Sequence, residues 1–203
     1  MTEICLASIV EGHGEVDAVP TILRRICTAI DSTRVVAVLR PIRVRRGQII
    51  KPGEVERYVE LAARRLGGRP GGVLVLLDAD DDCAAEMGNA LHRRASDQRS
   101  DTEFAVVLPV REFESWFLAA AASLAGHRGL RGDLQPPQRP DGVRDAKGWL
   151  QRNRIDGRAY SPTVDQPALA ARFDLEQARS GAPSFDKLWR DVERLMSSGA
   201  VDA

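Results

Sequence analysis

The sequence predicts an α/β fold, with an open, mostly parallel sheet of about four strands, helices on both faces and a C-terminal helical appendage. Two observations support this prediction. Over the first 120 or so residues, short apolar runs typical of strands alternate with segments whose apolar residues recur at helical spacing. Such alternation favours parallel strands joined by crossover helices. After residue 126, proline and arginine become frequent and the alternation ends.

Four segments are expected to form the sheet. The first ends at the turn-forming sequence Glu-Gly-His-Gly-Glu. The second is rich in β-branched residues, and Pro41 predicts that it is bent or lies at an edge. The third is continuously apolar, which favours burial on both faces. These segments are residues 4–10, 35–44, 73–77 and 104–110.

Helices are expected after each of these strands. Apolar residues at helical spacing mark the first two and the C-terminal helix, whereas the third is mostly polar and the fourth is rich in alanine. We expect residues 1–126 to form the α/β core, and residues 127–203 to form a Pro/Arg-rich segment and a C-terminal helix that packs on it. The expected helices span residues 16–30, 55–66, 82–95, 112–122 and 185–196.

The composition excludes several classes of protein. Of the 203 residues, 43% are hydrophobic, and no apolar run approaches the roughly 20 residues that cross a bilayer. The N-terminal apolar stretch has no basic flank and is interrupted at Glu11, which argues against a signal peptide. The three cysteines are too widely spaced for a zinc pair or a disulfide framework. We therefore expect a cytoplasmic protein with no membrane partner.

The formal net charge of zero hides a segregation of charge. Residues 40–69 carry nine Lys or Arg against three Glu, a local net charge of +6. Residues 78–86 carry five acids and no base, a local net charge of −5. This arrangement suits a polyanionic substrate held near a divalent cation. Two solvated surfaces are the simpler alternative.

Acidic residues follow three of the four predicted strands. Because ligand sites in open parallel sheets form beyond the carboxyl ends of the strands, we expect these acids to converge. Their mutual repulsion would be relieved by a hard divalent cation, and a carboxylate-only site favours Mg²⁺ or Mn²⁺. The alternatives are turn caps and first-turn helix acids. The candidate metal ligands are Glu11, Asp78, Asp80, Asp82, Glu112 and Glu114, with Glu11 and Glu15 as candidate catalytic residues.

Four arginines are candidate ligands for substrate phosphates. Arg43, Arg45 and Arg46 close the second predicted strand, where they could contact a nucleic-acid backbone or simply form a solvated edge. Arg111 adjoins the last acidic pair and could hold a phosphate or pair with a carboxylate.

The sequences Ile-Val-Glu-Gly-His-Gly-Glu at 9–15 and Val-Leu-Val-Leu-Leu-Asp-Ala-Asp at 73–80 resemble the topoisomerase–primase (Toprim) domain. With Arg-Glu-Phe-Glu-Ser-Trp-Phe-Leu at 111–118 and Pro-Ser-Phe-Asp-Lys-Leu at 183–188, nearly the whole chain resembles a bacterial Toprim-like family known as domain of unknown function 4276. The resemblance implies that Glu11 is a metal ligand and general acid/base, and that Asp78 and Asp80 hold Mg²⁺. Glu112 and Glu114 resemble later acids of Toprim nucleases of the overcoming-lysogenization-defect type.

These observations together predict a Mg²⁺- or Mn²⁺-dependent nuclease. The expected partner is nucleic acid, with DNA preferred over RNA, and an ATPase subunit or a second copy of the chain are further candidates. Resemblance alone implies a role in mobile-element or phage defence. A non-catalytic module that binds a nucleotide or a partner is the main alternative. A phosphatase of the haloacid-dehalogenase type fits less well, because those enzymes need Thr or Val two residues after the second Asp, where this chain has Asp82.

Overall fold

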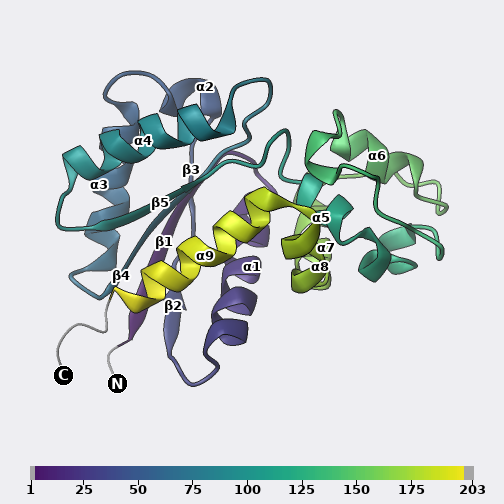
Figure 1. The fold of residues 1–203 in the computed structure, drawn as a ribbon, viewed down its shortest axis with the longest axis horizontal. Helices are drawn as coiled ribbons and strands as arrows, with labels where there is room; N and C mark the ends of the chain where they lie inside the picture. The colour runs from purple at the N-terminus through teal and green to yellow at the C-terminus, as the bar shows by residue number, and fades with distance from the viewer. Residues whose placement is uncertain (1–2, 199–203) are drawn as a thin grey trace.

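The computed structural model describes residues 3–198. Its single sheet has five strands, all paired in parallel, in the order β2-β1-β4-β5, with β3 also paired to β1 (Figure 1). The α/β class, the parallel sheet and the helices on both faces are confirmed. The strands are β1 (Ile4–Val10), β2 (Val36–Val38), β3 (Ile42–Arg43), β4 (Gly71–Leu76) and β5 (Glu103–Val107).

The predicted strand 35–44 is two short strands, β2 and β3, which pair in turn with β1 at one edge of the sheet. Ile4 is opposite Val36 and Ile9 is opposite Ile42, so the edge strand contains one more residue than β1 over this stretch. Pro41 lies in the interruption and has no N–H to donate. The edge position that Pro41 predicts is therefore confirmed, with the pairing interrupted at the proline.

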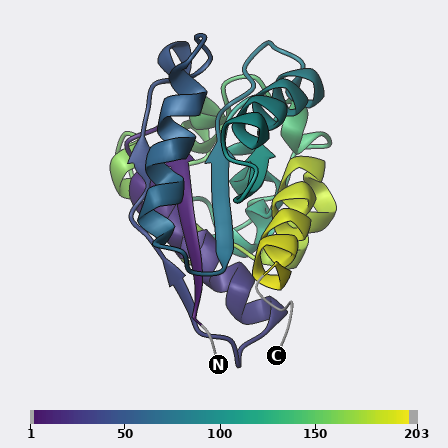
Figure 2. The ribbon, with the colours of Figure 1, turned by 90° about the vertical axis from the view of Figure 1, so that its left-hand side faces the viewer.

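Alternate residues of each strand point to the two faces of the sheet. From β1, Ile4 and Leu6 join the core beneath α1 and α9, whereas Cys5 and Ala7 join the core beneath α3 and α4. Figure 2 shows α3 and α9 on opposite sides of the central strands. The four long helices are α1 (Glu15–Ile30), α3 (Glu54–Leu66), α4 (Ala84–Gln98) and α9 (Pro183–Ser197).

The chain between β5 and α9 forms short helices gathered beyond one end of the sheet (Figure 1). The helix predicted at 112–122 is only five residues long, and three helices in the Pro/Arg-rich segment were not predicted. Residues before and after 126 share one apolar core, in which Phe117 and Phe185 both pack against Phe173. The short helices are α2 (Arg46–Ile49), α5 (Ser115–Ala119), α6 (Ala146–Arg152), α7 (Pro162–Ala170) and α8 (Leu175–Gly181), with 3₁₀ turns at Ala121–Leu124, His127–Gly129 and Pro140–Gly142.

Candidate active site

Two of the predicted acids lie at the carboxyl ends of adjacent central strands. Val10 of β1 is opposite Leu76 of β4, so Glu11 leaves the sheet beside the residues that lead to Asp78. The backbone N–H of Phe113, which follows β5, donates to Oδ1 of Asp78 at 2.7 Å. The loops after β1, β4 and β5 therefore meet at this end of the sheet, as expected for parallel strands.

The turn after β1 is built around Glu15, the first residue of α1. Glu15 is only 4% exposed, and its Oε2 accepts the backbone N–H of Glu11 at 3.0 Å. A Cβ atom at Gly12 would lie 2.6 Å from Oε1 of Glu15, and one at Gly14 would overlap Oε1 of Gln166. Gly14 is needed because a Cβ there would also overlap the backbone oxygen of Pro162, whereas at Gly12 the atoms in the way belong to the Glu15 side chain.

Burial and mutual repulsion raise the pKa values of the acids gathered here. Burial raises the pKa of Glu15 to about 7. Burial, followed by the charges of Glu15 and Glu114, raises the pKa of Asp78 well above its usual range. The pKa of Glu11 is raised by burial and by the charge of Asp80. These five side chains thus lie close enough to influence one another's ionisation.

Glu114 is completely buried and is contacted from the C-terminal segment. One carboxylate oxygen accepts the Tyr160 hydroxyl at 3.1 Å and the Gln166 amide at 2.8 Å. The other lies 3.4 Å from Nζ of Lys147, which also donates to Glu112 at 2.8 Å. Burial raises the pKa of Glu114, with Lys147 acting in the opposite direction. Burial alone would lower the pKa of Lys147, but the charges of Glu114 and Glu112 outweigh it and raise that pKa.

The other aspartates after β4 point toward the rim. Asp80 and Asp82 have side chains that are each 57% exposed, and both form ion pairs with Arg46. Asp80 has a backbone φ of 51°, in the left-handed region, which turns the chain sharply after Asp78. Nε of Arg46 also donates to the backbone oxygen of Asp78 at 3.1 Å. Asp78 alone of the three therefore faces the buried acids.

The predicted phosphate-binding arginines lie around the same end of the sheet. Arg43 donates to the backbone oxygen of Glu11 at 3.4 Å, and Arg45 is exposed. Arg111 donates to the backbone oxygen of Asp80 at 2.7 Å and forms an ion pair with Asp81. Like Arg46, Arg111 is thus engaged by acids of the chain itself. Phosphate binding by these arginines stays a prediction.

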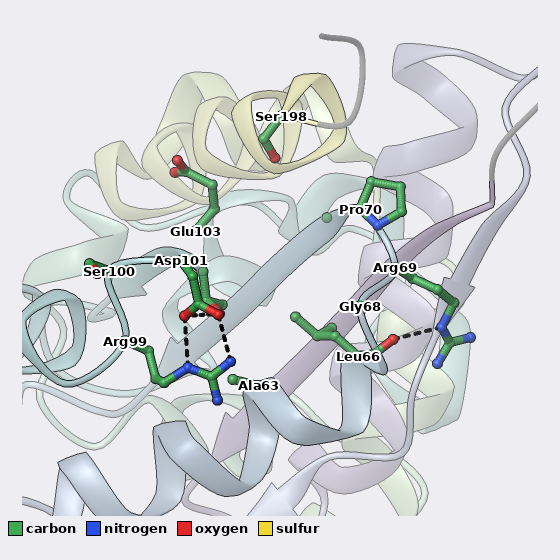
Figure 3. A pocket seen from close by; sticks show the side chains of 12 residues that line it. Ala63, Leu66, Gly68, Arg69, Pro70, Arg99, Ser100, Asp101, Glu103 and Ser198 are labelled. Atoms are coloured by element: carbon green, nitrogen blue, oxygen red, sulfur yellow. Dashed lines mark hydrogen bonds and ion pairs between the residues drawn. The ribbon is translucent and has the colours of Figure 1, made fainter. Parts of the chain in front are cut away.

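A hollow of about 400 Å³ lies at the opposite end of the sheet, near the start of β4 and β5 (Figure 3). Its two guanidinium groups are already engaged within the chain. Arg99 pairs with Asp101 and Glu60, and Arg69 pairs with Glu3 and donates to the backbone oxygen of Leu66. This hollow brings together none of the predicted site residues.

The residues that sequence reasoning missed all come from the segment after 126. Lys147, Tyr160 and Gln166 surround Glu114, but nothing in the spacing of that segment shows that it folds back over the strand ends. The chain has only Lys51, Lys147 and Lys187 among 29 basic residues. A lysine in an arginine-rich chain is a weak signal that could have drawn attention to Lys147.

The oxygen ligands of the site suit a hard cation, but the acidic side chains that the structure describes are not grouped closely enough to hold one in their present positions. Oε2 of Glu11 is a buried oxygen with no hydrogen-bond donor, and Oε2 of Glu114 is a buried oxygen whose one cationic neighbour is Nζ of Lys147 at 3.4 Å. Carboxylate oxygens are the ligands that Mg²⁺ and Mn²⁺ prefer. Across residues 3–198, however, no three His, Cys, Asp or Glu side chains are grouped closely enough to hold a metal ion. An ion bound here would require at least one side chain to turn.

Comparisons with known proteins identify the family of the chain but do not indicate an activity. Searches of curated proteins and of solved structures gave no significant match. None of the helices within residues 3–198 combines the length and apolar character needed to span a membrane. The model of a domain family of unknown function, DUF4276, matches residues 10–193. This range includes the acids that follow β1, β4 and β5 and the residues of the C-terminal segment that contact them. The chain therefore belongs to the DUF4276 family.

Proposed function

We propose that the protein is a divalent-metal-dependent nuclease of the Toprim kind, which hydrolyses phosphodiester bonds in nucleic acid with Mg²⁺ or Mn²⁺. The observation that carries the proposal is the convergence of Glu11, Glu15, Asp78 and Glu114 at the ends of adjacent strands, with pKa values raised by burial. Such clustering of perturbed acids is more frequent at functional sites than elsewhere. DNA is the preferred substrate.

Glu11, Asp78 and Glu114 are the residues that would hold the cation. Oε2 of Glu11 is buried without a donor, and Oε2 of Glu114 is buried with only Lys147 beside it. The charges of both residues act on Asp78. Asp80, Asp82 and Glu112, which face the rim or Lys147, would complete the coordination only after rearrangement. When bound, the ion would polarise a phosphate oxygen and lower the pKa of a coordinated water.

The protein's own side chains provide proton transfer and positioning. A carboxylate with a pKa of about 7, such as Glu15, is ionised in about half of the molecules at neutral pH and is suited to accept a proton from water. Glu11 precedes Glu15 in the same turn and lies nearer the solvent. Arg43, Arg45, Arg46 and Arg111 surround the site and would neutralise the charge of a bound backbone.

One observation favours the alternative of a non-catalytic binding module. Lys147 already provides a cation to Glu112 and Glu114, and Arg46 provides one to Asp80 and Asp82. A site neutralised from within could be a structural network beneath a binding surface for a nucleotide or a partner protein, such as an ATPase subunit or a second copy of the chain.

A cleavage assay separates the two functions. Pure protein is incubated with plasmid, single-stranded DNA and RNA in Mg²⁺, in Mn²⁺ and in EDTA, together with the variants Asp78→Asn and Asp133→Asn. Asp133 is an exposed aspartate paired with Arg131 and serves as the control. We expect metal-dependent cleavage that Asp78→Asn abolishes and Asp133→Asn leaves unchanged. The absence of cleavage in every condition, or equal cleavage by Asp78→Asn, contradicts the nuclease proposal.

A further inference from the structure

A small cavity of about 130 Å³ opens at the rim of the candidate active site, beside Glu112. Its lining contains two arginines from different parts of the chain. Arg111 follows β5, and Arg144 lies just before α6, the helix that brings Lys147 to Glu112 and Glu114. The cavity is lined by Asp80, Asp81, Arg111, Glu112, Arg144 and Asp145.

The two guanidinium groups converge on the carboxylate of Asp81. Arg144 lies 2.8 Å from Oδ1 of Asp81, and Arg111 forms an ion pair with the same oxygen. Two arginines that share one anionic oxygen form a fork of the kind that binds phosphate. In addition, the buried Nε of Arg111 has no hydrogen-bond acceptor. Asp81 therefore does not satisfy every donor of Arg111.

Asp81 is easily displaced from this fork. Its side chain is 74% exposed, on the loop between β4 and α4, and ion pairs between exposed side chains are weak because water and salt screen them. Its neighbour Asp80 holds the left-handed backbone conformation that directs Asp81 outward.

The other acids of the cavity already have cations of their own. Glu112 is paired with Lys147 and Asp145 with Arg152, while Asp80 is paired with Arg46. Arg144 has no ion pair other than Asp81 among the described residues, and Arg111 has no other carboxylate partner there. Once Asp81 leaves, the two guanidinium groups are the uncompensated charges of the cavity, and an anion is the ligand that they would take.

We propose that Arg111 and Arg144 form a phosphate clamp for the backbone of a nucleic acid, which Asp81 closes when no substrate is bound. The assignment to a nucleic acid rests on the proposed nuclease function, since the clamp adjoins Glu112 at the edge of the acidic site. Arg144 is then a substrate-positioning residue, and Asp81 is an internal competitor that the incoming phosphate replaces.

The clamp is tested by binding in EDTA, where no cleavage occurs. Affinities for a single-stranded DNA, an RNA of the same sequence and inorganic phosphate are measured for wild type, Asp81→Asn, Arg144→Gln and the double variant. Asp133→Asn and Arg190→Gln are the controls, because they change charge equally in exposed ion pairs away from the cavity. All four substituted side chains are largely exposed, and circular dichroism verifies that the variants fold.

We expect Asp81→Asn to tighten oligonucleotide binding about two- to fivefold relative to Asp133→Asn, since one exposed competing ion pair is removed. Arg144→Gln should weaken binding about tenfold relative to Arg190→Gln, because a charge-assisted contact to phosphate is lost. In the double variant the gain from Asp81→Asn should disappear, since its effect acts through Arg144.

Three outcomes overturn the clamp. The first is that Asp81→Asn binds no more tightly than Asp133→Asn, and the second is that its gain persists without Arg144. The third is a gain for inorganic phosphate with none for DNA or RNA, which would mean that the clamp does not bind a nucleic-acid backbone. If the binding effects are found but the protein cleaves no nucleic acid, the clamp is supported and only the proposed catalysis is rejected. If the protein cleaves nucleic acid but the binding effects are missing, the clamp is rejected and the proposed catalysis is not.

Discussion

Replacing Glu15 with glutamine should change how the stability of the protein depends on pH. Burial raises the pKa of Glu15 from 4.5 to about 7 in the folded protein. A carboxyl group with a raised pKa contributes its full stability below its unfolded pKa and loses it as pH rises through the folded pKa. The wild-type protein should therefore become less stable between pH 5 and pH 8, and Glu15→Gln, which resembles the protonated acid, should lose less stability over this window.

The size of the effect follows from the pKa shift. A shift from 4.5 to about 7 corresponds to about 3 kcal/mol of unfolding free energy between the protonated and the ionised forms. Asp78 and Glu11 also have raised pKa values. The stability of the wild type should therefore fall with pH more steeply than Glu15 alone would cause. Exposed acids with lowered pKa values, such as Asp156 with a pKa of about 2, titrate below this window.

Urea unfolding at pH 5, 6, 7 and 8 in EDTA measures the slope directly. The control is Glu60→Gln, because Arg99 and Arg64 lower the pKa of the Glu60 carboxyl and its charge is constant across this range. We expect Glu60→Gln to keep the wild-type slope and Glu15→Gln to reduce the loss by about 2.5 kcal/mol, the part of the full effect that falls between pH 5 and pH 8. If Glu15→Gln loses stability as steeply as the wild type, the burial argument for this carboxyl is wrong.

Two further variants test contacts from the C-terminal segment. Lys147→Met should destabilise the protein at pH 7.5 by about 3 kcal/mol, because Glu114 is left buried without a cation. At pH 5 this loss of stability should shrink as Glu114 protonates. An unchanged urea midpoint at pH 7.5 would contradict the prediction. Gly14→Ala should lower stability by about 2 kcal/mol, because its Cβ would overlap the backbone oxygen of Pro162 as well as the Gln166 side chain. Gly47→Ala, whose Cβ meets no atom within 4 Å, is the control, and equal thermal melting of both alanine variants would refute the overlap.

The convergence of Glu11 and Asp78 could be anticipated because it follows from topology. Two parallel strands that pair side by side must bring their carboxyl ends to one edge, whatever the details of packing. The interruption of the edge strand at Pro41 follows equally from local chemistry, since a proline removes one ladder donor. These features depend on neighbouring residues and on the general rules of parallel sheets.

The contacts of Glu114 could not be anticipated, because they depend on how a distant segment packs. Gln166 reaches this carboxylate from α7 and Tyr160 from the residues just before it. The backbone of Pro162, at the start of α7, lies close to Gly14. The helices of this segment are short, with α6 and α8 of seven residues each, and helices of that length depend on tertiary contacts more than on their own sequence. Periodicity is therefore a poor guide to them.

The orientation of the acids after β4 illustrates the same limit. Strand alternation predicts that Asp78 and Asp80 point to one side, but β4 ends at Leu76 and the chain turns at Asp80 with a φ of 51°. Asp80 consequently meets Arg46 at the rim while Asp78 faces the buried acids. Alternation holds only as far as the strand continues.

The central claim is that carboxylates from separate strands share one cation. Crystals of the protein soaked in Mn²⁺ and measured at the manganese absorption edge test it most directly, with Asp78→Asn crystals treated in parallel. We predict an anomalous peak between Glu11 and Asp78 that is absent from the variant. The contrary result is a wild-type crystal with no peak within coordination distance of Asp78, or with Mn²⁺ bound only elsewhere on the surface.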